Sequence, residues 1–233
     1  MNSWSKWRLI SISLMLLVLL IGCGPSLMQI KTTMQEQYTL PDNYTMVQHN
    51  PQIDRPVLVI QHPVEHPAAR GNKKKSTGLI AAEKQMTENN RNFLIRRLFE
   101  TQAFRQIMPQ DDPFDPSLPK DILILEAKQE MNISKNASPD WRTGLMETKS
   151  ENTYLIRDPQ TGHSFLTKVE TLGFPNHKTG MAEFDYNIDN NEKFKYEIKS
   201  SDSDYFKKMA NASSDALGRI INVITKKLIK EGY

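Results

Sequence analysis

The chain has 233 residues, a formal net charge of +3 from 30 basic and 27 acidic side chains, and a single cysteine. Two basic residues lie in a leader that we expect to be removed, which leaves 28 basic against 27 acidic residues, a net charge of +1. This balance argues against a nucleic-acid partner, since such proteins carry a basic surplus. One cysteine excludes an intramolecular disulfide and a cysteine metal cluster, and we expect no cofactor.

Residues 1–22 have the order of an export signal. Lys6 and Arg8 precede an apolar run from Leu9 to Ile21, and the small residue Gly22 follows it. A basic start, a short apolar centre and a small residue before the cut are typical of such signals. The run is also shorter than the roughly 20 residues that a membrane-spanning helix needs.

The end of this segment resembles the lipobox of bacterial lipoproteins, in Leu20, Ile21, Gly22 and Cys23. The resemblance implies a diacylglyceryl thioether on Cys23, cleavage before it, and usually acylation of the freed amine. Two or three acyl chains, at ~0.8 kcal/mol per buried CH₂, would anchor the protein to the membrane. Gly24 stands where an Asp retains some lipoproteins at the inner membrane, so the resemblance implies the periplasmic face of the outer membrane. An uncleaved helix with a chance cysteine is the alternative.

After the lipidated cysteine, residues 23–54 are polar and proline-bearing, which predicts a tether. A single periplasmic α/β domain is expected over residues 55–233. It opens with a short β-branched strand at 57–60. A long helix is expected at 78–101, with Asn90 as a polar gap in its apolar face.

Further strands are expected at 104–108 and 120–134, and the apolar first half of the latter should be central in a sheet. Residues 144–173 predict a hairpin whose turn is 158–162, because proline early and glycine late suit such a turn. A second, alternating hairpin is expected at 181–198.

The chain closes with an amphipathic helix within 202–232, whose three- and four-residue apolar series includes Ser213. The predicted fold class is α/β (α+β). It is a two-layer sandwich in which a mixed sheet of four to five strands packs against two long helices, with the 181–198 hairpin as an addition.

Two stretches resemble the CsgG, LpoB and TolB amino-terminal group. Residues 90–108 look like its helix-to-strand step, and residues 154–167 like its strand running into D-x-x-T-G. The matching positions are Tyr154, Leu155, Ile156, Asp158, Thr161, Gly162 and Phe165. The resemblance implies an envelope lipoprotein that binds other proteins, sometimes as a ring, without catalytic machinery. The lysine-rich loop before the helix and the extra 174–199 segment depart from the group.

His62, Glu65 and His66 have the H-x-x-E-H spacing of one class of zinc peptidase. That spacing works on a helix, which places the two histidines on one face. Pro63 and Pro67 disfavour helical geometry at the residues before them, so the shared face is lost. Plain loop histidines are the main interpretation, and a non-helical metal site at these three residues is the alternative.

The loop before the first helix is basic, with Arg70, Lys73, Lys74 and Lys75. It lacks the glycines that a phosphate-binding loop requires. A solvated loop is the simple interpretation, and contact with acidic groups of a partner or of lipids is the alternative. Trp141 is either an exposed binding anchor or a lid on the sheet edge.

The leading hypothesis is a non-enzymatic accessory protein of a multi-protein envelope machine for secretion, surface-appendage assembly or cell-wall synthesis. Its partners would be the membrane, through the lipid on Cys23, and other envelope proteins, with a homo-oligomer as a further option. The first alternative is a subunit of an oligomeric outer-membrane pore that inserts hairpin 181–198, although its arms are shorter than the ~9–11 residues of a spanning strand. The second is a metal- or ligand-binding lipoprotein that uses loop 62–66.

Overall fold

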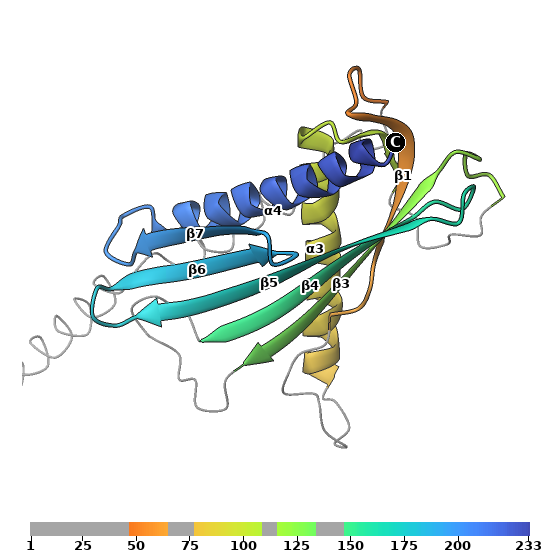
Figure 1. The fold of residues 1–233 in the computed structure, drawn as a ribbon. Coiled ribbons are helices and arrows are strands. Elements are labelled where there is room, and N and C mark those ends of the chain that lie inside the picture. Colours follow the sequence, from red (N-terminus) through yellow and green to blue (C-terminus); the bar gives the residue numbers. More distant parts are fainter. Residues whose placement is uncertain (1–46, 65–76, 109–115, 134–146) are drawn as a thin grey trace, which may run out of the picture. The chain divides into compact units, whose positions relative to one another are not determined.

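The computed structural model describes residues 47–64, 77–108, 116–133 and 147–233. Within these ranges the chain forms seven strands and two long helices (Figure 1). In chain order they are β1 (Ile53–Gln61), α3 (Thr77–Glu100), β2 (Phe104–Met108), β3 (Leu123–Ile133), β4 (Thr148–Arg157), β5 (Ser164–Asn176), β6 (Met181–Ile188), β7 (Glu192–Lys199) and α4 (Tyr205–Lys230). The predicted broad class, α+β with a mixed sheet and two long helices, is confirmed.

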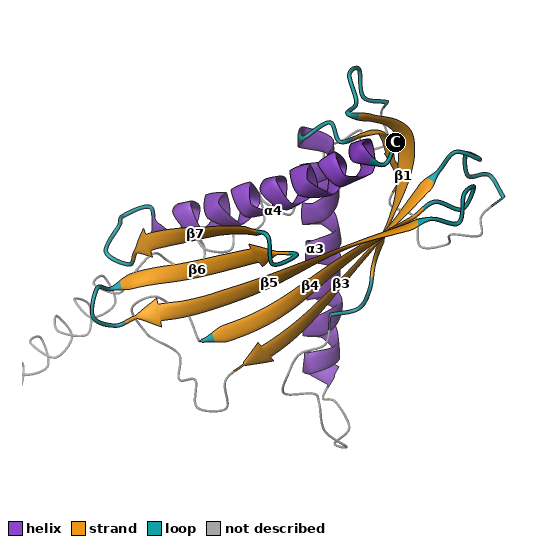
Figure 2. Cartoon of the chain, viewed as in Figure 1, coloured by secondary structure: helices purple, strands orange, loops and turns teal. Residues whose placement is uncertain are grey.

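All seven strands belong to one sheet, in the order β2-β1-β3-β4-β5-β6-β7 (Figure 2). Strand β1 is parallel to both β2 and β3, whereas each later pair is antiparallel. Parallel neighbours need a crossover connection, and α3 supplies the one between β1 and β2. From β3 onward, strands that are consecutive in the chain are neighbours in the sheet.

The most apolar strands lie where both faces of the sheet are covered. Val57, Leu58 and Val59 of β1 are fully buried at consecutive positions, and so is Leu123 at the start of β3. The side away from the helices is closed there by a small cluster around Leu58, Ile122 and Ile124. The predicted central place of the first half of β3 is confirmed, since β3 lies between β1 and β4.

Both helices contribute to the same hydrophobic core on one side of the sheet. Helix α3 packs over β1 and β2, and α4 packs over β5 and β7. The helices also contact each other, and at Gly218 of α4 an added Cβ would come 2.3 Å from Nη2 of Arg97 of α3. Glycine therefore leaves room for the end of the Arg97 side chain at this contact. Within the described ranges, no helix combines the length and hydrophobicity that crossing a bilayer requires.

The predicted count of four to five strands with a separate hairpin is wrong. The 181–198 hairpin is β6 and β7, and the pairing of β6 with β5 makes them a continuation of the sheet. Its inner side packs on α4, where Ala182, Ile198 and Tyr205 are buried together. Because α4 has 26 residues, it reaches over these added strands and gives their apolar positions cover.

The domain also begins earlier than the predicted boundary at residue 55. Ile53 is fully buried in the core. The main-chain N–H of Gln48 donates to Arg105 at 2.7 Å, and that of Gln52 donates to Gln102 at 2.9 Å. Polar composition predicted a tether here, but main-chain hydrogen bonds to the β2 region do not depend on apolar side chains.

An ion pair closes the end of the sheet where β1 and β4 meet the last residue of the chain. Both Nη atoms of Arg55 donate to the Asp158 carboxylate at 2.9 Å, and its Nε donates to the carbonyl of Asp121 at 2.7 Å. The hydroxyl of Tyr233 donates to the same carboxylate at 2.8 Å, and the guanidinium lies 5.3 Å from the centre of its ring. The Arg55 hydrogen bonds, followed by that of Tyr233, hold the pKa of the Asp158 carboxyl well below its usual range.

The same carboxylate organises the predicted turn at 158–162, which is confirmed between β4 and β5. It accepts hydrogen bonds from the main-chain N–H of Gln160 at 3.0 Å and from the hydroxyl of Thr161 at 3.0 Å. Gly162 has φ +72, a left-handed conformation that favours glycine. The Asp, Thr and Gly residues of the D-x-x-T-G motif therefore all stabilise this turn.

We expect Asp158→Ala to lower the free energy of unfolding by about 3 kcal/mol, because a mostly covered guanidinium loses its partner. Urea unfolding at neutral pH measures this. Glu170→Ala is the matched control, since its pair with Lys149 is exposed, at 52% and 39%, on the other face. Such a pair contributes less than about 1 kcal/mol. Equal losses in the two variants would contradict the role assigned to Asp158.

The depressed pKa of Asp158 also predicts a dependence on acid. A carboxyl whose folded-state pKa is lowered stabilises the fold above its unfolded pKa of about 4, and this contribution is lost as the pH falls through the folded-state pKa. Below about pH 4, the natural chain should therefore lose unfolding free energy more steeply than Asp158→Asn. Parallel acid profiles in urea would show that Asp158 titrates alike in both states.

Candidate functional site

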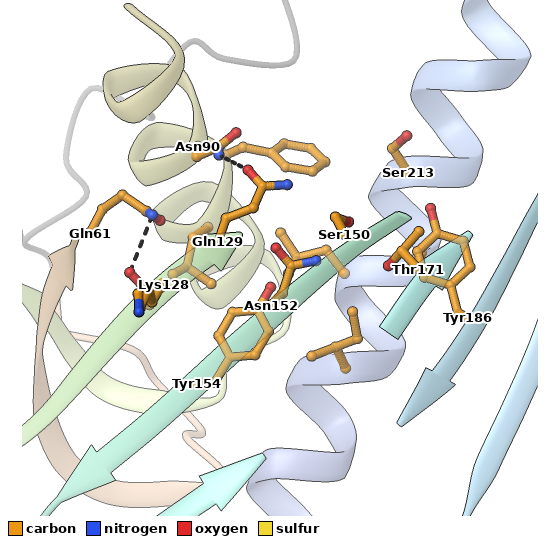
Figure 3. Close-up of a pocket in the computed structure, with 16 residues that line it drawn as sticks. Gln61, Asn90, Lys128, Gln129, Ser150, Asn152, Tyr154, Thr171, Tyr186 and Ser213 are labelled. Atoms are coloured by element: carbon orange, nitrogen blue, oxygen red, sulfur yellow. Dashed lines mark hydrogen bonds between the residues drawn. The ribbon is translucent and has the colours of Figure 1, made fainter. Parts of the chain in front are cut away.

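A cavity of about 250 Å³ with a mixed polar and apolar lining lies between the two helices and the sheet (Figure 3). Residues of β1, β3, β4, β5 and β6 contribute to it, together with residues of α3 and α4. Amide and hydroxyl side chains dominate part of its lining: Gln61, Asn90, Gln129, Ser150, Asn152, Tyr154, Thr171, Tyr186 and Ser213. The helix-covered side of a sheet is normally apolar, so this polar lining distinguishes the cavity as the candidate site.

Strand register brings the polar residues of the sheet into rows. Gln129 of β3 is paired with Asn152 of β4, and Ser150 of β4 is paired with Thr171 of β5. Thr171 is in turn paired with Tyr186 of β6. Because directly paired residues in antiparallel strands point to the same face, these side chains line the cavity side by side.

Strand β4 shows where the core gives way to the cavity. Its helix-facing positions run from Ile156, which is buried, through the half-buried Tyr154 and Asn152 to Ser150. The apolar end of this series belongs to the main core, with Tyr154 packed against it. The polar end belongs to the cavity. One alternating strand thus serves both core packing and the lining of the site.

The helices contribute polar groups from within their apolar faces. Nδ2 of Asn90 in α3 donates to Oε1 of Gln129 at 2.7 Å. Among the described residues, each of these two side chains makes this one hydrogen bond. Oδ1 of Asn90 and Nε2 of Gln129 therefore remain able to bond a ligand. Ser213 of α4 is exposed and lies at the rim.

Apart from Lys128, the lining groups are neutral near pH 7. Burial raises the pKa of the Tyr186 phenol to about 12, and burial is also the main cause that raises the pKa of Tyr154. Both hydroxyls therefore stay protonated and can donate as well as accept hydrogen bonds. Lys128 contributes to the lining, but its ammonium pairs with Glu130 at 2.7 Å, where both side chains are at least half exposed. The cavity is equipped for hydrogen bonding rather than proton transfer.

Most residues that the sequence singled out lie outside the described ranges, namely Leu20, Ile21, Gly22, Cys23, Glu65, His66, Arg70, Lys73, Lys74, Lys75 and Trp141. Lipidation of Cys23 therefore stays a prediction. The same holds for partner contacts of the basic loop and of Trp141.

His62 is described, and it pairs with a strand residue. Its Nε2 lies 3.1 Å from Oε2 of Glu126 in β3, and its side chain is 44% exposed. Glu126 also pairs with Arg157 of β4. A carboxylate already engaged by a cation is a poorer metal ligand. The described residues contain no group of three or more His, Cys, Asp or Glu that could hold a metal ion; Glu65 and His66 lie outside them.

The cavity was not predicted from the sequence, although two of its residues indicate it. Asn90 interrupts the apolar face of its helix, and Ser213 does the same in the last helix. A single polar residue on an apolar face is an ambiguous signal. Two such residues become informative when a polar strand face lies beneath them.

No protein-family model matches the chain, and no curated protein matches its sequence. The likeness to the CsgG, LpoB and TolB amino-terminal group therefore stays a prediction from its motifs. What the chain does must follow from its own residues and their geometry.

If the polar lining serves binding, replacing it with apolar residues should not harm the fold. We expect Asn152→Val to raise the free energy of unfolding by about 0.5 kcal/mol through strand propensity. Ser213→Ala should gain a similar amount through helix propensity. Ile156→Val, on the same strand and face as Asn152, is the control and should lose about 1 kcal/mol. Urea unfolding measures the three variants. If Asn152→Val and Ser213→Ala each lowered the free energy of unfolding by about 1 kcal/mol, the polar lining would have a structural role instead.

Proposed function

We propose that this chain is a lipid-anchored periplasmic protein of the outer membrane that assists a multi-protein envelope machine by binding other proteins. The candidate machines are those of secretion, surface-appendage assembly and cell-wall synthesis. The observation that carries the proposal is the position of the sole cysteine, Cys23, directly after Leu20, Ile21 and Gly22 at the end of an export-like segment. The α+β domain that follows supplies the surface that would meet the neighbours.

The anchor would limit how far the domain can move from the membrane. Val47, where the described domain begins, lies 24 positions after Cys23. Covalent geometry limits each residue to roughly 3.5 Å, so the domain would stay within about 85 Å of the acyl chains. Partners would therefore be other proteins at the same membrane surface.

The sheet face opposite the helices offers a mixed surface for such contacts. Charged side chains pair across neighbouring strands there, as in Lys149 with Glu170 at 2.6 Å. Next to this charged surface Leu166 is 44% exposed, and it is paired with Leu155 of β4. Charges of both signs beside an exposed aliphatic side chain suit a polar protein interface better than a membrane interior.

The nature of the cavity also favours a binding protein over an enzyme. Amides and protonated hydroxyls form hydrogen bonds with a ligand, but they do not exchange protons readily near neutral pH. The pKa of Asp158 is strongly lowered, but its carboxylate accepts hydrogen bonds from Arg55 and from its own turn. This shift therefore reflects a structural ion pair.

The pore alternative requires the β6–β7 hairpin to leave its place. Each strand has eight residues, short of the ~9–11 of a spanning strand. Tyr196 of β7 hydrogen-bonds to Asp215 of α4, and the guanidinium of Arg219 lies 5.2 Å from the ring centre of Phe194. These contacts bind the hairpin to α4, and they favour the accessory role.

We expect Cys23→Ser to release the protein from the membrane fraction and to abolish incorporation of radiolabelled palmitate, because the thiol is the acceptor of the lipid. Cell fractionation and labelling measure the two effects. Gly24→Ala, beside the cysteine, is the matched control and should stay labelled and membrane-bound. A Cys23→Ser variant that remains membrane-bound would count against the anchor.

Crosslinking in intact envelopes followed by mass spectrometry should capture the same neighbouring proteins in repeated experiments. Replacing Arg70, Lys73, Lys74 and Lys75 together with Ser should reduce capture several-fold if this loop meets acidic groups of the partner. Lys193→Ser and Lys199→Ser on the edge strand provide a control for loss of positive charge. The absence of any reproducible neighbour would contradict the accessory role.

A further inference from the structure

We infer that the cavity between α3, α4 and the sheet binds a neutral saccharide that carries an acetamido group, such as an N-acetylglucosamine unit. This inference goes beyond the proposed anchoring and protein binding. It concerns a site on the helix-covered face, whereas the charged strand surface lies on the opposite face. It can be tested on the purified protein, and its outcome does not depend on where the protein is anchored.

The size of the cavity fits one substituted sugar ring. Its volume is about 250 Å³. A core cavity of roughly 150 Å³ is known to hold benzene. The extra space accommodates a six-membered ring with its substituents but not a large cofactor. Several lining residues are half-buried rather than buried, so the cavity communicates with solvent and a ligand can enter.

The Asn90–Gln129 pair presents two groups that can bond an acetamido substituent. Its internal hydrogen bond, 2.7 Å from Nδ2 to Oε1, fixes the orientation of both amides. One acceptor, Oδ1 of Asn90, and one donor, Nε2 of Gln129, remain unused among the described residues. An acetamido group has one N–H and one carbonyl, which point in opposite directions. Its N–H can therefore donate to Oδ1 of Asn90, or its carbonyl can accept from Nε2 of Gln129.

The remaining polar groups suit ring hydroxyls. Ser150, Thr171 and Tyr186 follow one another across three neighbouring strands. Asn152 lies beside this row, opposite Gln129. Hydroxyl and amide groups both donate and accept, as sugar hydroxyls do, and a site built to hydrogen-bond a hydroxyl strongly disfavours analogues that lack it.

Apolar side chains complete the recognition of a sugar. Phe93 of α3 and Leu217 of α4 line the cavity together with the ring of Tyr154. A pyranose has C–H groups on its faces and hydroxyls at its edge. A site with apolar walls and a few convergent polar groups matches this distribution.

A peptide is a poorer match, because peptides recognised by strands use the main chain. Strands β3, β4 and β5 each have a hydrogen-bonded neighbour on both sides. Their main-chain groups are therefore engaged in the ladder, and the cavity presents side chains instead. Neutral amides and hydroxyls also lack the charges that would hold a peptide terminus or an acidic side chain.

The first test is calorimetric titration of the detergent-solubilised full-length protein with N-acetylglucosamine and its β-1,4-linked trimer. We expect a Kd on the order of 1 mM or tighter for the monosaccharide. Glucose, which lacks the acetamido group, should bind at least about ten-fold more weakly. Equal affinity for glucose, no heat of binding with either acetamido sugar, or tighter binding of an end-blocked trialanine peptide would overturn the proposal.

The second test places the sugar in the cavity. Asn90→Leu and Asn152→Leu should each weaken binding at least about ten-fold. Thr153→Leu, one residue further on β4 and on the opposite face, is the matched control and should leave Kd unchanged. Tyr186→Phe removes a single hydroxyl and should weaken binding a few-fold without disturbing the fold. Thermal unfolding confirms that each variant is folded, and unchanged Kd in the folded Asn90→Leu and Tyr186→Phe variants would overturn the assignment.

Discussion

Two helices cross on one face of the sheet. The position of the crossing determines which part of this face is packed as core and which part lines a cavity. The helices meet where Gly218 lies against the side chain of Arg97. Beyond this point, Leu98 of α3 and Ile221 of α4 are buried in the core. Before it, Asn90 and Ser213 line the cavity. Crossed helices pack closely only near their contact, so the space on the other side of it must be filled by side chains or left for a ligand.

The sheet depends on a second constraint, its register. A slip of one residue would turn the polar rows of β4 and β5 to the opposite face and destroy both core and cavity. The turn between these strands is held by Asp158, through Arg55, Thr161 and Tyr233. The Arg55–Asp158 ion pair therefore influences the cavity although it lies outside it. It holds the turn between β4 and β5, and the register of these strands places Ser150 opposite Thr171.

Polar residues have different roles on the two faces of the sheet. On the open face, charged side chains pair with each other and keep the strands compatible with water. On the covered face, the cavity holds polar groups such as Asn90 and Gln129 whose bonding capacity is only partly used. Such groups do little for stability, and departures from the usual apolar packing of a helix-covered face are expected at functional sites. A lipid-anchored domain of this kind would meet proteins with one surface and hold a small ligand beneath its helices.

The sequence alone determined the helices, most strand positions, the central place of β3 and the turn at 158–162, because periodicity and turn chemistry are local properties. It placed the sole cysteine in a lipobox-like tetrad for the same reason. It did not determine the number of strands in one sheet, since whether the 181–198 hairpin joins β5 depends on cover from α4. Nor did it reveal the cavity, whose key contact joins Asn90 to Gln129 across 39 positions. Alternation shows that a strand has two faces, but only the packed helices decide which polar face becomes a binding site.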